Sequence, residues 1–326
     1  MSNGEHDDNQ NKGDVQADKR AILMSAEQLQ DSLRRECVHV IDVRGGVHKA
    51  GGRITQSGFQ ATHYEADRGA YEEARITGAM FIDWRHVDLC KCDVLQRAMQ
   101  QVVGNEDKLI CIYDWGDMLF SCRLWFALCA IGYERVGVLN GGWQSWSEYK
   151  GEVTRNGSVE LTLDGQSERL SRNEKSVSME MMKRLVQSKR EFDAASLEDD
   201  VVMIDARSAR QYVGEERRTV RGGHIAYAKN VPYRRLLQPN GIGFVPDAEL
   251  KRRLQQCDVR LRTRCGKKKR FVNYCNGGVS CTVVAFALLR SGVEWHCVRN
   301  YCGSFNEWGN RCDTPITNLT APTYKR

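Results

Sequence analysis

Three short motifs occur twice in this chain. Their apolar, acidic and aromatic residues keep the same order, as in Val-Ile-Asp-Val-Arg and Met-Ile-Asp-Ala-Arg. The matched segments are 40–44 with 203–207, 110–114 with 271–275, and 140–146 with 302–308. The two copies of each motif lie 161–163 residues apart. Because three offsets agree this closely, the 326 residues are expected to form two copies of one domain.

Each copy has the same order of apolar segments. A short apolar run ends in Asp-x-Arg, a second run follows, and a helix-patterned segment and a third short run come after it. Short apolar runs that alternate with helical segments indicate βαβ units whose parallel sheet is buried on both faces. The predicted fold class is therefore α/β, with two domains that each hold a parallel β-sheet flanked by helices on both faces. The expected strands are 38–43, 109–113, 136–139, 201–204, 271–274 and 297–298, and the expected helices are 120–131 and 281–289.

Composition divides the chain into four predicted segments. Residues 1–21 contain almost no large apolar side chains and more acids than bases, which is typical of a disordered acidic tail. The two domains are expected at 22–149 and 179–326, and the polar, glycine-dotted stretch 150–178 is expected to be a linker. A further polar, glycine-rich stretch at 51–69 lengthens the first copy and is predicted to be a surface loop.

The charge and hydropathy of the chain limit the classes of partner that we expect it to bind. The net charge of +6 is too small to indicate nucleic-acid binding, and the longest uncharged apolar run, 281–289, is about half the ~20 residues that a membrane span needs. Seven of the basic residues lie within 260–270. This stretch is interpreted as a solvated loop, with a docking patch for an acidic partner as the alternative. We expect neither nucleic acid nor membrane as a partner.

Thirteen cysteines are many for a chain of this length. The odd count and the lack of a hydrophobic signal segment indicate reduced thiols, so we expect a cytoplasmic protein, with the mitochondrion as the alternative. No Cys-x-x-Cys pair occurs, and neither a metal site nor a cofactor is predicted.

One cysteine stands where a nucleophile would be expected. Cys275 ends the predicted strand 271–274, and a glycine-containing loop separates it from the next helix. Loop amides and the positive end of a helix both lower a thiol pKa, which would make Cys275 nucleophilic. The alternative is that Cys275 is one more buried cysteine, and in the first copy Asp114 occupies the equivalent position. The loop residues expected to bind substrate are Asn276, Gly277, Gly278, Val279 and Ser280.

The order of motifs resembles that of the tandem rhodanese-domain sulfurtransferases, the thiosulfate and 3-mercaptopyruvate sulfurtransferase family. The resemblance covers about residues 22–316. It is carried by Asp-Ala-Arg-Ser at 205–208, Gly-Gly-His-Ile at 222–225, Tyr-Cys-Asn-Gly-Gly-Val at 274–279 and Gly-Ser-Phe-x-Glu-Trp-Gly at 303–309, with matching motifs in the first copy. It implies that Cys275 carries sulfane sulfur as a persulfide and that the first copy is catalytically silent.

The resemblance also implies partners and further site residues. Small anionic donors, thiosulfate or 3-mercaptopyruvate, would give sulfur to cyanide or a thiol acceptor, which includes a thioredoxin-like protein. Arg217 best matches the arginine that contacts the donor in the family, with Arg218 and Arg221 as alternatives. A second donor arginine would fall at Gln211, where Arg210 is the nearest substitute. In the family, mercaptopyruvate-type members carry small neutral residues after the cysteine, so the neutral residues after Cys275 favour mercaptopyruvate or an unassigned donor over thiosulfate.

Two other functions remain open from the sequence. Phosphatases of related fold need an arginine six residues after the cysteine, and this chain has Cys281 there, so phosphate-ester hydrolysis is disfavoured. A non-catalytic sulfur carrier or regulatory module would keep Cys275 but show little turnover. Cys281 itself is either a buried helix residue or the partner of Cys275 in a disulfide formed on oxidation.

Overall fold

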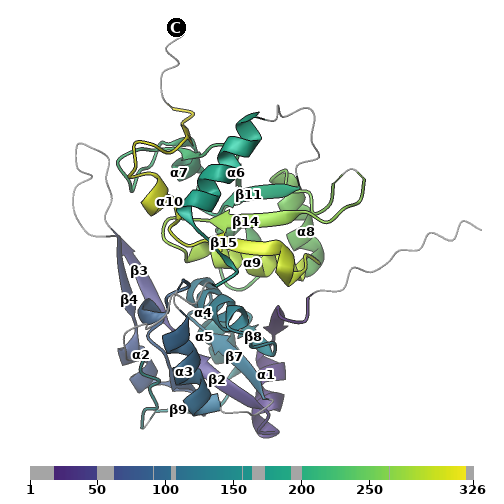
Figure 1. Cartoon of the computed structure of the whole chain (residues 1–326). Helices are drawn as coiled ribbons and strands as arrows, with labels where there is room; N and C mark the ends of the chain where they lie inside the picture. The colour runs from purple at the N-terminus through teal and green to yellow at the C-terminus, as the bar shows by residue number, and fades with distance from the viewer. Residues whose placement is uncertain are drawn as a thin grey trace, which may run out of the picture.

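The computed structural model describes residues 18–49, 62–90, 92–103, 108–155, 157–163, 173–191, 200–263 and 265–320. Two five-stranded sheets, in which every pair of neighbouring strands is parallel, form the centres of the two halves. The first has the strand order β1 (Ile22–Met24), β8 (Val136–Leu139), β7 (Leu109–Tyr113), β2 (Val38–Asp42), β6 (Met80–Phe81). The second has the equivalent order β10 (Ser176–Val177), β15 (Val298–Tyr301), β14 (Arg270–Tyr274), β11 (Val201–Asp205), β13 (Lys229–Asn230). The predicted α/β class and the duplication are confirmed (Figure 1).

Helices cover both faces of each sheet. In β7, Ile110 and Ile112 pack with α3 (Asp93–Val103) and α4 (Leu119–Ala130), whereas Cys111 and Tyr113 pack with α1 (Ala26–Arg34) and α5 (Gly142–Tyr149). This alternation follows from the two-residue period of side chains along a strand. The second sheet has α8 (Asp247–Gln256) and α9 (Ser280–Arg290) on one face, and α6 (Met179–Glu191) and α10 (Ser304–Trp308) on the other.

Short elements complete the two domains. They are α2 (Arg68–Glu73), α7 (Ala209–Val213), the 3-10 helices η1 (Trp84–His86), η2 (Tyr233–Leu236) and η3 (Trp295–Cys297), and three antiparallel pairs: β3 (Gly45–Lys49) with β4 (Thr62–Ala66), β5 (Arg75–Ile76) with β9 (Val153–Thr154), and β12 (His224–Ile225) with β16 (Ile316–Thr317).

The repeated motifs of the sequence meet in space in the first domain. Arg44 forms a buried ion pair with Asp42 at 2.8 Å, and the hydroxyl of Tyr113 donates to the same carboxylate at 2.5 Å. The Arg44 guanidinium also lies 4.3 Å from the ring centroid of Trp143. A buried charge is tolerated only when it is paired and hydrogen-bonded, so these four residues are kept together.

The second domain repeats this arrangement. Arg207 pairs with Asp205 at 2.6 Å and lies 3.8 Å over the ring of Phe305, which corresponds to Trp143. Tyr274 hydrogen-bonds Asp205 in the same way. The Asp-x-Arg motifs therefore have a structural role, because they join each central strand to the loops at its carboxyl end.

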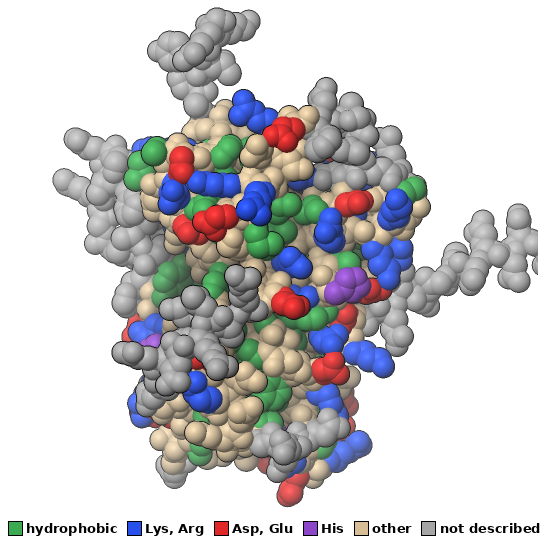
Figure 2. Space-filling model, in the orientation of Figure 1, with side chains coloured by type: hydrophobic (Ala, Val, Ile, Leu, Met, Phe, Trp, Pro, Cys, Tyr) green, Lys and Arg blue, Asp and Glu red, His purple; other side chains and the backbone are tan. Residues whose placement is uncertain are grey.

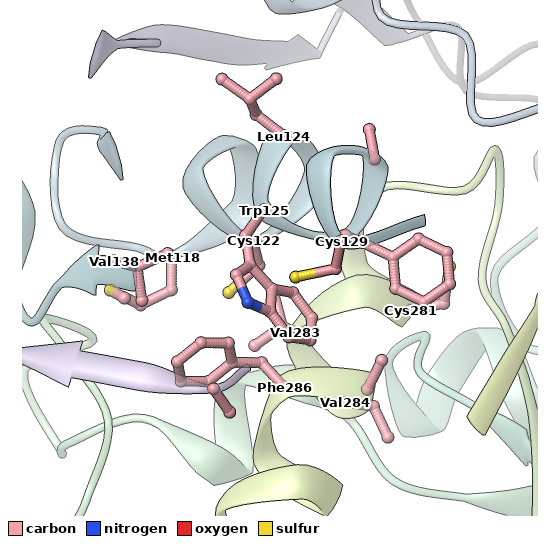
Figure 3. Close-up of a cluster of buried hydrophobic side chains, with 14 of the residues drawn as sticks. Met118, Cys122, Leu124, Trp125, Cys129, Val138, Cys281, Val283, Val284 and Phe286 are labelled. Carbon is pink, nitrogen blue, oxygen red and sulfur yellow. The ribbon is translucent and has the colours of Figure 1, made fainter. Parts of the chain in front are cut away.

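Helices α4 and α9 pack against each other between the two domains (Figures 1 and 3). Each is buried nearly all round because its own sheet lies on one side and the other domain on the opposite side. The ring of Trp125 on α4 meets Phe286 on α9 edge to face, with 4.8 Å between centroids, and also contacts Trp295. One continuous core cluster consequently includes residues of both domains.

Three predicted boundaries differ from the structure. Residues 18–21, placed in the tail, are anchored: the Trp295 amide donates to Asp18 at 2.9 Å, and Ala21 is buried. The predicted linker 150–178 contains β9 at one end and β10 at the other, and its residues 164–172 lie outside the described part. The predicted loop 51–69 contains β4, which pairs with β3, while residues 51–61 also lie outside the described residues.

The third strand of the second domain was placed too early, since Cys297 belongs to η3 and β15 begins at Val298. A negatively charged residue lies beside the basic stretch 260–270, since Glu294 forms an ion pair with Lys268. Figure 2 shows Lys and Arg interspersed with Asp and Glu over the visible face. Arg264 lies outside the described residues. In the described parts of the chain, no helix is long and apolar enough to cross a membrane.

Replacement of Trp125 tests whether the hydrophobic cores of the two domains form one joined core. Trp125→Ala removes a fully buried indole that contacts both domains, so it is expected to lower the free energy of unfolding by about 3–5 kcal/mol. Urea unfolding followed by far-UV circular dichroism measures this. Tyr149→Ala, at a ring that is 44% exposed, is the control. A loss no larger than that of the control would contradict the joined core.

Candidate active site

Cys275 begins the loop that joins β14 to α9, and its side chain is buried at the carboxyl end of the sheet. The Gly278 amide donates to Cys275 Sγ at 3.1 Å. Gly278 has φ of +81°, a conformation that favours glycine and that turns its amide toward the sulfur. Contacts from behind fix the loop: Ser304 Oγ accepts the Cys275 amide at 3.2 Å, and the Phe305 amide donates to the Cys275 carbonyl at 2.9 Å.

The environment of Cys275 favours its thiolate. Burial raises the pKa of Cys275, but hydrogen bonds from the thiol and amide of Cys281, from Ser280 and from the Gly277 amide outweigh it and hold the pKa well below that of an ordinary thiol. Val279 is the N-cap residue of α9, and the side chain of the next residue, Ser280, hydrogen-bonds the sulfur. Such a thiolate is a nucleophile at neutral pH.

The equivalent loop of the first domain holds a carboxylate instead. Asp114 Oδ1 accepts the Gly116 amide at 2.8 Å, and Oδ2 accepts the amides of Phe120 and Ser121 and the Ser121 hydroxyl at 2.8–3.2 Å. The duplicated loop is thus an anion cradle in both copies. In the first copy the side chain of Asp114 fills it, and carboxylate oxygens do not form persulfides.

A cavity of about 650 Å³ opens beside Cys275 and has walls from both domains. The first domain contributes Tyr64 of β4 and Asp117 and Leu119 from the start of α4. The predicted loop residues Asn276, Gly277, Val279 and Ser280 line it, whereas Gly278 lies behind and packs near Arg123. Four arginines line the cavity: Arg207, Arg218, Arg234 and Arg235.

The predicted donor arginines are not among the described residues that line this cavity. Arg210 is exposed and pairs with Glu215 at 3.4 Å, and the Arg217 side chain packs over Gly222. In the structure it is the neighbouring Arg218, in the loop after α7, that lines the cavity, so Arg210 and Arg217 as donor-binding residues stay predictions. Gln211, at the position of the family's second arginine, lines the cavity and accepts the Asn276 side-chain amide at 3.3 Å.

Arg218 has the features of an anion-binding residue. It hydrogen-bonds Tyr64, and its Nε is buried without a hydrogen-bond partner among the described residues. Buried donors are almost always paired, so an unpaired one that lines a cavity indicates a place for a bound anion. Arg221, the other alternative, donates to the carbonyls of Thr314 and Trp308 and has a structural role.

Sequence reasoning did not predict Arg234, Arg235 and Asp117, which also line the cavity. Arg234 and Arg235 belong to η2, and two adjacent arginines were a signal that the sequence analysis did not use. Asp117 belongs to the first domain and reaches the cavity because α4 packs against the loop that begins at Cys275. Burial and the charge of Asp114 raise the pKa of Asp117 to about 7, against the lowering effects of the Leu119 amide and Arg234.

Cys281 is fully buried on α9 (Figure 3). Burial and its hydrogen bond to Cys275 keep the pKa of the Cys281 thiol well above the ordinary value. It therefore acts as a hydrogen-bond donor to the Cys275 thiolate. A disulfide between the two remains a prediction. Among the described residues, no group of three or more His, Cys, Asp or Glu could hold a metal ion.

Comparison with known proteins finds a matching domain family and homologous sequences. The rhodanese-like domain matches twice, over residues 25–149 and 188–311. A 3-mercaptopyruvate sulfurtransferase of Escherichia coli O157:H7 is 28% identical over 261 residues, which is 76% of this chain and 85% of that protein. The sulfur carrier protein TtuD of Thermus thermophilus is 25% identical over 268 residues, or 76% of this chain and 86% of that protein.

The fold is also found among solved structures. The crystal structure of SseA from Escherichia coli superposes with a TM-score of 0.62 at 24% identity, over 86% of this chain and 98% of that one. This structure shows that the fold is shared. The homologous sequences support sulfurtransferase function. The chain belongs to the rhodanese-like domain family and contains two copies of that domain.

Proposed function

We propose that this protein transfers sulfane sulfur from a small anionic donor, through a persulfide on Cys275, to cyanide or a thiol acceptor. The observation that carries the proposal is the low-pKa thiolate of Cys275 beside a cavity with four arginines. The second domain is the catalytic one in this proposal. The first is silent because Asp114 occupies its anion cradle.

The reaction has two steps. The Cys275 thiolate attacks the outer sulfur of thiosulfate, or the single sulfur of 3-mercaptopyruvate. The S–S or C–S bond to that sulfur then breaks with its electron pair on the leaving group, which is sulfite or the enolate of pyruvate. The enolate takes up the proton that the mercaptopyruvate sulfur loses, which gives pyruvate. The new persulfide carries negative charge on its terminal sulfur, which the loop amides stabilise. The acceptor then attacks this sulfur and releases the Cys275 thiolate.

We propose 3-mercaptopyruvate as the preferred donor and thiosulfate as the weaker one. Asn276 and Gly277, which follow the nucleophile, are neutral, so the loop adds no charge for the dianionic thiosulfate. The arginines available to bind a carboxylate lie on other elements, in particular Arg218 and the η2 pair. Similarity to the Escherichia coli 3-mercaptopyruvate enzyme supports this choice.

The acceptor and the compartment belong to the same proposal. A small thiol or a reduced thioredoxin-like protein would receive the sulfur, as the family resemblance implies. All thirteen cysteines are free thiols, which suits a reducing compartment such as the cytoplasm or the mitochondrion.

Similarity to a sulfur carrier favours one alternative, a protein that is loaded at Cys275 but turns over little. Steady-state kinetics with mercaptopyruvate and cyanide separate the two functions. Sustained thiocyanate release supports an enzyme, and a single stoichiometric burst supports a carrier.

Intact-mass analysis tests the nucleophile. Wild-type protein exposed to mercaptopyruvate is expected to gain one sulfur atom, and peptide mapping should place it on Cys275. Cys275→Ser should gain none, because serine oxygen lacks the thiolate that attacks the donor. Cys312→Ser, at an exposed free thiol, should load like wild type. Persulfide formation in Cys275→Ser would overturn the assignment.

Arginine substitutions test donor binding. Arg218→Ala is expected to lower kcat/KM for either donor by about one to two decades, since a hydrogen bond to a charged group contributes ~1.5–3 kcal/mol. Arg210→Ala, at an exposed arginine outside the cavity, is the matched control and should stay within about two-fold. If Arg218→Ala behaves like Arg210→Ala, Arg218 does not bind the donor.

The pKa of Asp117 predicts a pH dependence. Below about pH 7 the carboxyl is neutral, and above it a negative charge enters the cavity beside Arg234. For thiosulfate, whose own charge is constant near neutral pH, kcat/KM should therefore fall as pH rises through about 7. Asp117→Asn keeps the side chain neutral and should flatten this limb of the profile. An unchanged limb in Asp117→Asn would assign the pH dependence to another group.

A further inference from the structure

Two thiols from different domains meet beside the catalytic loop. Cys90 follows η1 in the first domain, and Cys302 directly follows β15 in the second. Both contact one hydroxyl: Cys90 Sγ lies 3.4 Å from Ser176 Oγ, which donates to Cys302 Sγ at 3.3 Å. The two thiols also hydrogen-bond each other. They are the only such pair across the domain boundary for which a thiol–thiol hydrogen bond is found in the described residues.

The two sulfurs are chemically unequal. The hydrogen bond from Cys302 lowers the pKa of Cys90 to about 6, and Ser176 and Arg123 lower it further against the effects of burial and Asp88. The same hydrogen bond, together with burial, raises the pKa of Cys302 well above the ordinary value. At neutral pH the pair therefore consists of a thiolate and a thiol in contact. By contrast, burial raises the pKa of the nearby Cys92 to about 12.

The pair lies against the active site. Arg123 of α4 donates to the Gly278 carbonyl at 2.9 Å and to the Val87 carbonyl at 2.7 Å, so it holds the catalytic loop and the first domain together. The Cys302 carbonyl also packs close to Gly278. Cys302 lies near Cys281, which hydrogen-bonds Cys275, so ionisation of Cys302 would raise the pKa of Cys281. Any change at Cys302 is therefore next to the loop that holds the nucleophile.

We propose that Cys90 and Cys302 are a modification site, a dithiol that a hydroperoxide converts into a disulfide between the two domains. A thiolate in contact with a thiol is the arrangement that disulfide formation needs. Both thiols are half-buried. Cys90 reacts with the oxidant first because it is the thiolate of the pair, whereas Cys302 acts as the resolving thiol. This inference does not depend on the proposed sulfurtransferase reaction, because neither thiol is the nucleophile of that reaction.

The chemistry balances with the hydroperoxide as the only oxidant. The Cys90 thiolate attacks one peroxide oxygen, the O–O bond breaks, and hydroxide leaves, which gives a sulfenic acid on Cys90. The Cys302 sulfur then attacks the Cys90 sulfur, the S–O bond breaks, and the oxygen leaves as water with the Cys302 proton. The two thiols lose two electrons, which the peroxide gains.

Peptide mapping of the full-length Cys275→Ser protein tests the disulfide without interference from the nucleophile. After treatment with stoichiometric hydrogen peroxide and non-reducing digestion, a species that links the peptides of Cys90 and Cys302 should appear, lighter by two hydrogens than their sum. It should vanish on treatment with dithiothreitol and be absent when Cys90→Ser or Cys302→Ser is added. Cys257→Ser, at another half-exposed thiol, should leave it unchanged. Cys90 oxidised beyond the sulfenic acid, with no linked species, would overturn the proposal.

Alkylation of unoxidised protein tests the pairing itself. In Cys302→Ala, which removes the hydrogen-bond donor, the pKa of Cys90 should return toward the ~8.5 of a free thiol, so its reaction with iodoacetamide at pH 7 should slow by about tenfold. Cys257→Ala should not alter the Cys90 rate. An unchanged rate in Cys302→Ala would show that Cys302 does not activate Cys90. This result is independent of persulfide loading at Cys275, so it separates failure of this inference from failure of the proposed function.

Discussion

The packing of α4 against α9 is the contact on which the rest of this structure depends. These helices are apolar all round, and neither could face water without exposing large side chains such as Trp125 and Phe286. Burying them against each other joins the two cores into one cluster. It also brings Arg123 to the carbonyl of Gly278 and Asp117 to the cavity beside Cys275. The first domain is therefore a structural part of the candidate active site.

The duplicated loops show how one scaffold supports two outcomes. Both follow a central strand, both precede a buried helix, and both direct donors at a single side chain. A carboxylate in this position is a buried anion stabilised by its hydrogen bonds. A thiol in the same position becomes a reactive thiolate, because the donors of its loop stabilise the Cys275 thiolate as those of the first copy stabilise Asp114. The side chain that receives these donors differs between the copies, while the shared Asp-x-Arg pairs keep both strand ends in place.

The local residue pattern was sufficient to predict the bounds of individual strands and helices with unbroken apolar runs. The strand 109–113 and the helices after each loop were predicted within one residue of their observed bounds, because their apolar runs are unbroken. The stretch 51–69 was different. Its glycines and polar residues are typical of a loop, yet β4 pairs with β3 and places Tyr64 in the cavity, since antiparallel pairing supplies the hydrogen bonds that the composition did not indicate.

By itself, the sequence determined the duplication, the parallel sheets and the position of Cys275, because repeats, apolar runs and a glycine loop are all local or periodic signals. Only the tertiary structure decided which arginine faces the cavity. Arg217 and Arg218 are adjacent, and a one-residue difference in an irregular loop reverses the direction of the side chain, which no periodicity fixes. The tertiary structure likewise brought Cys90 to Cys302 and Asp117 to Arg234, since each contact joins residues of different domains and depends on how the domains pack.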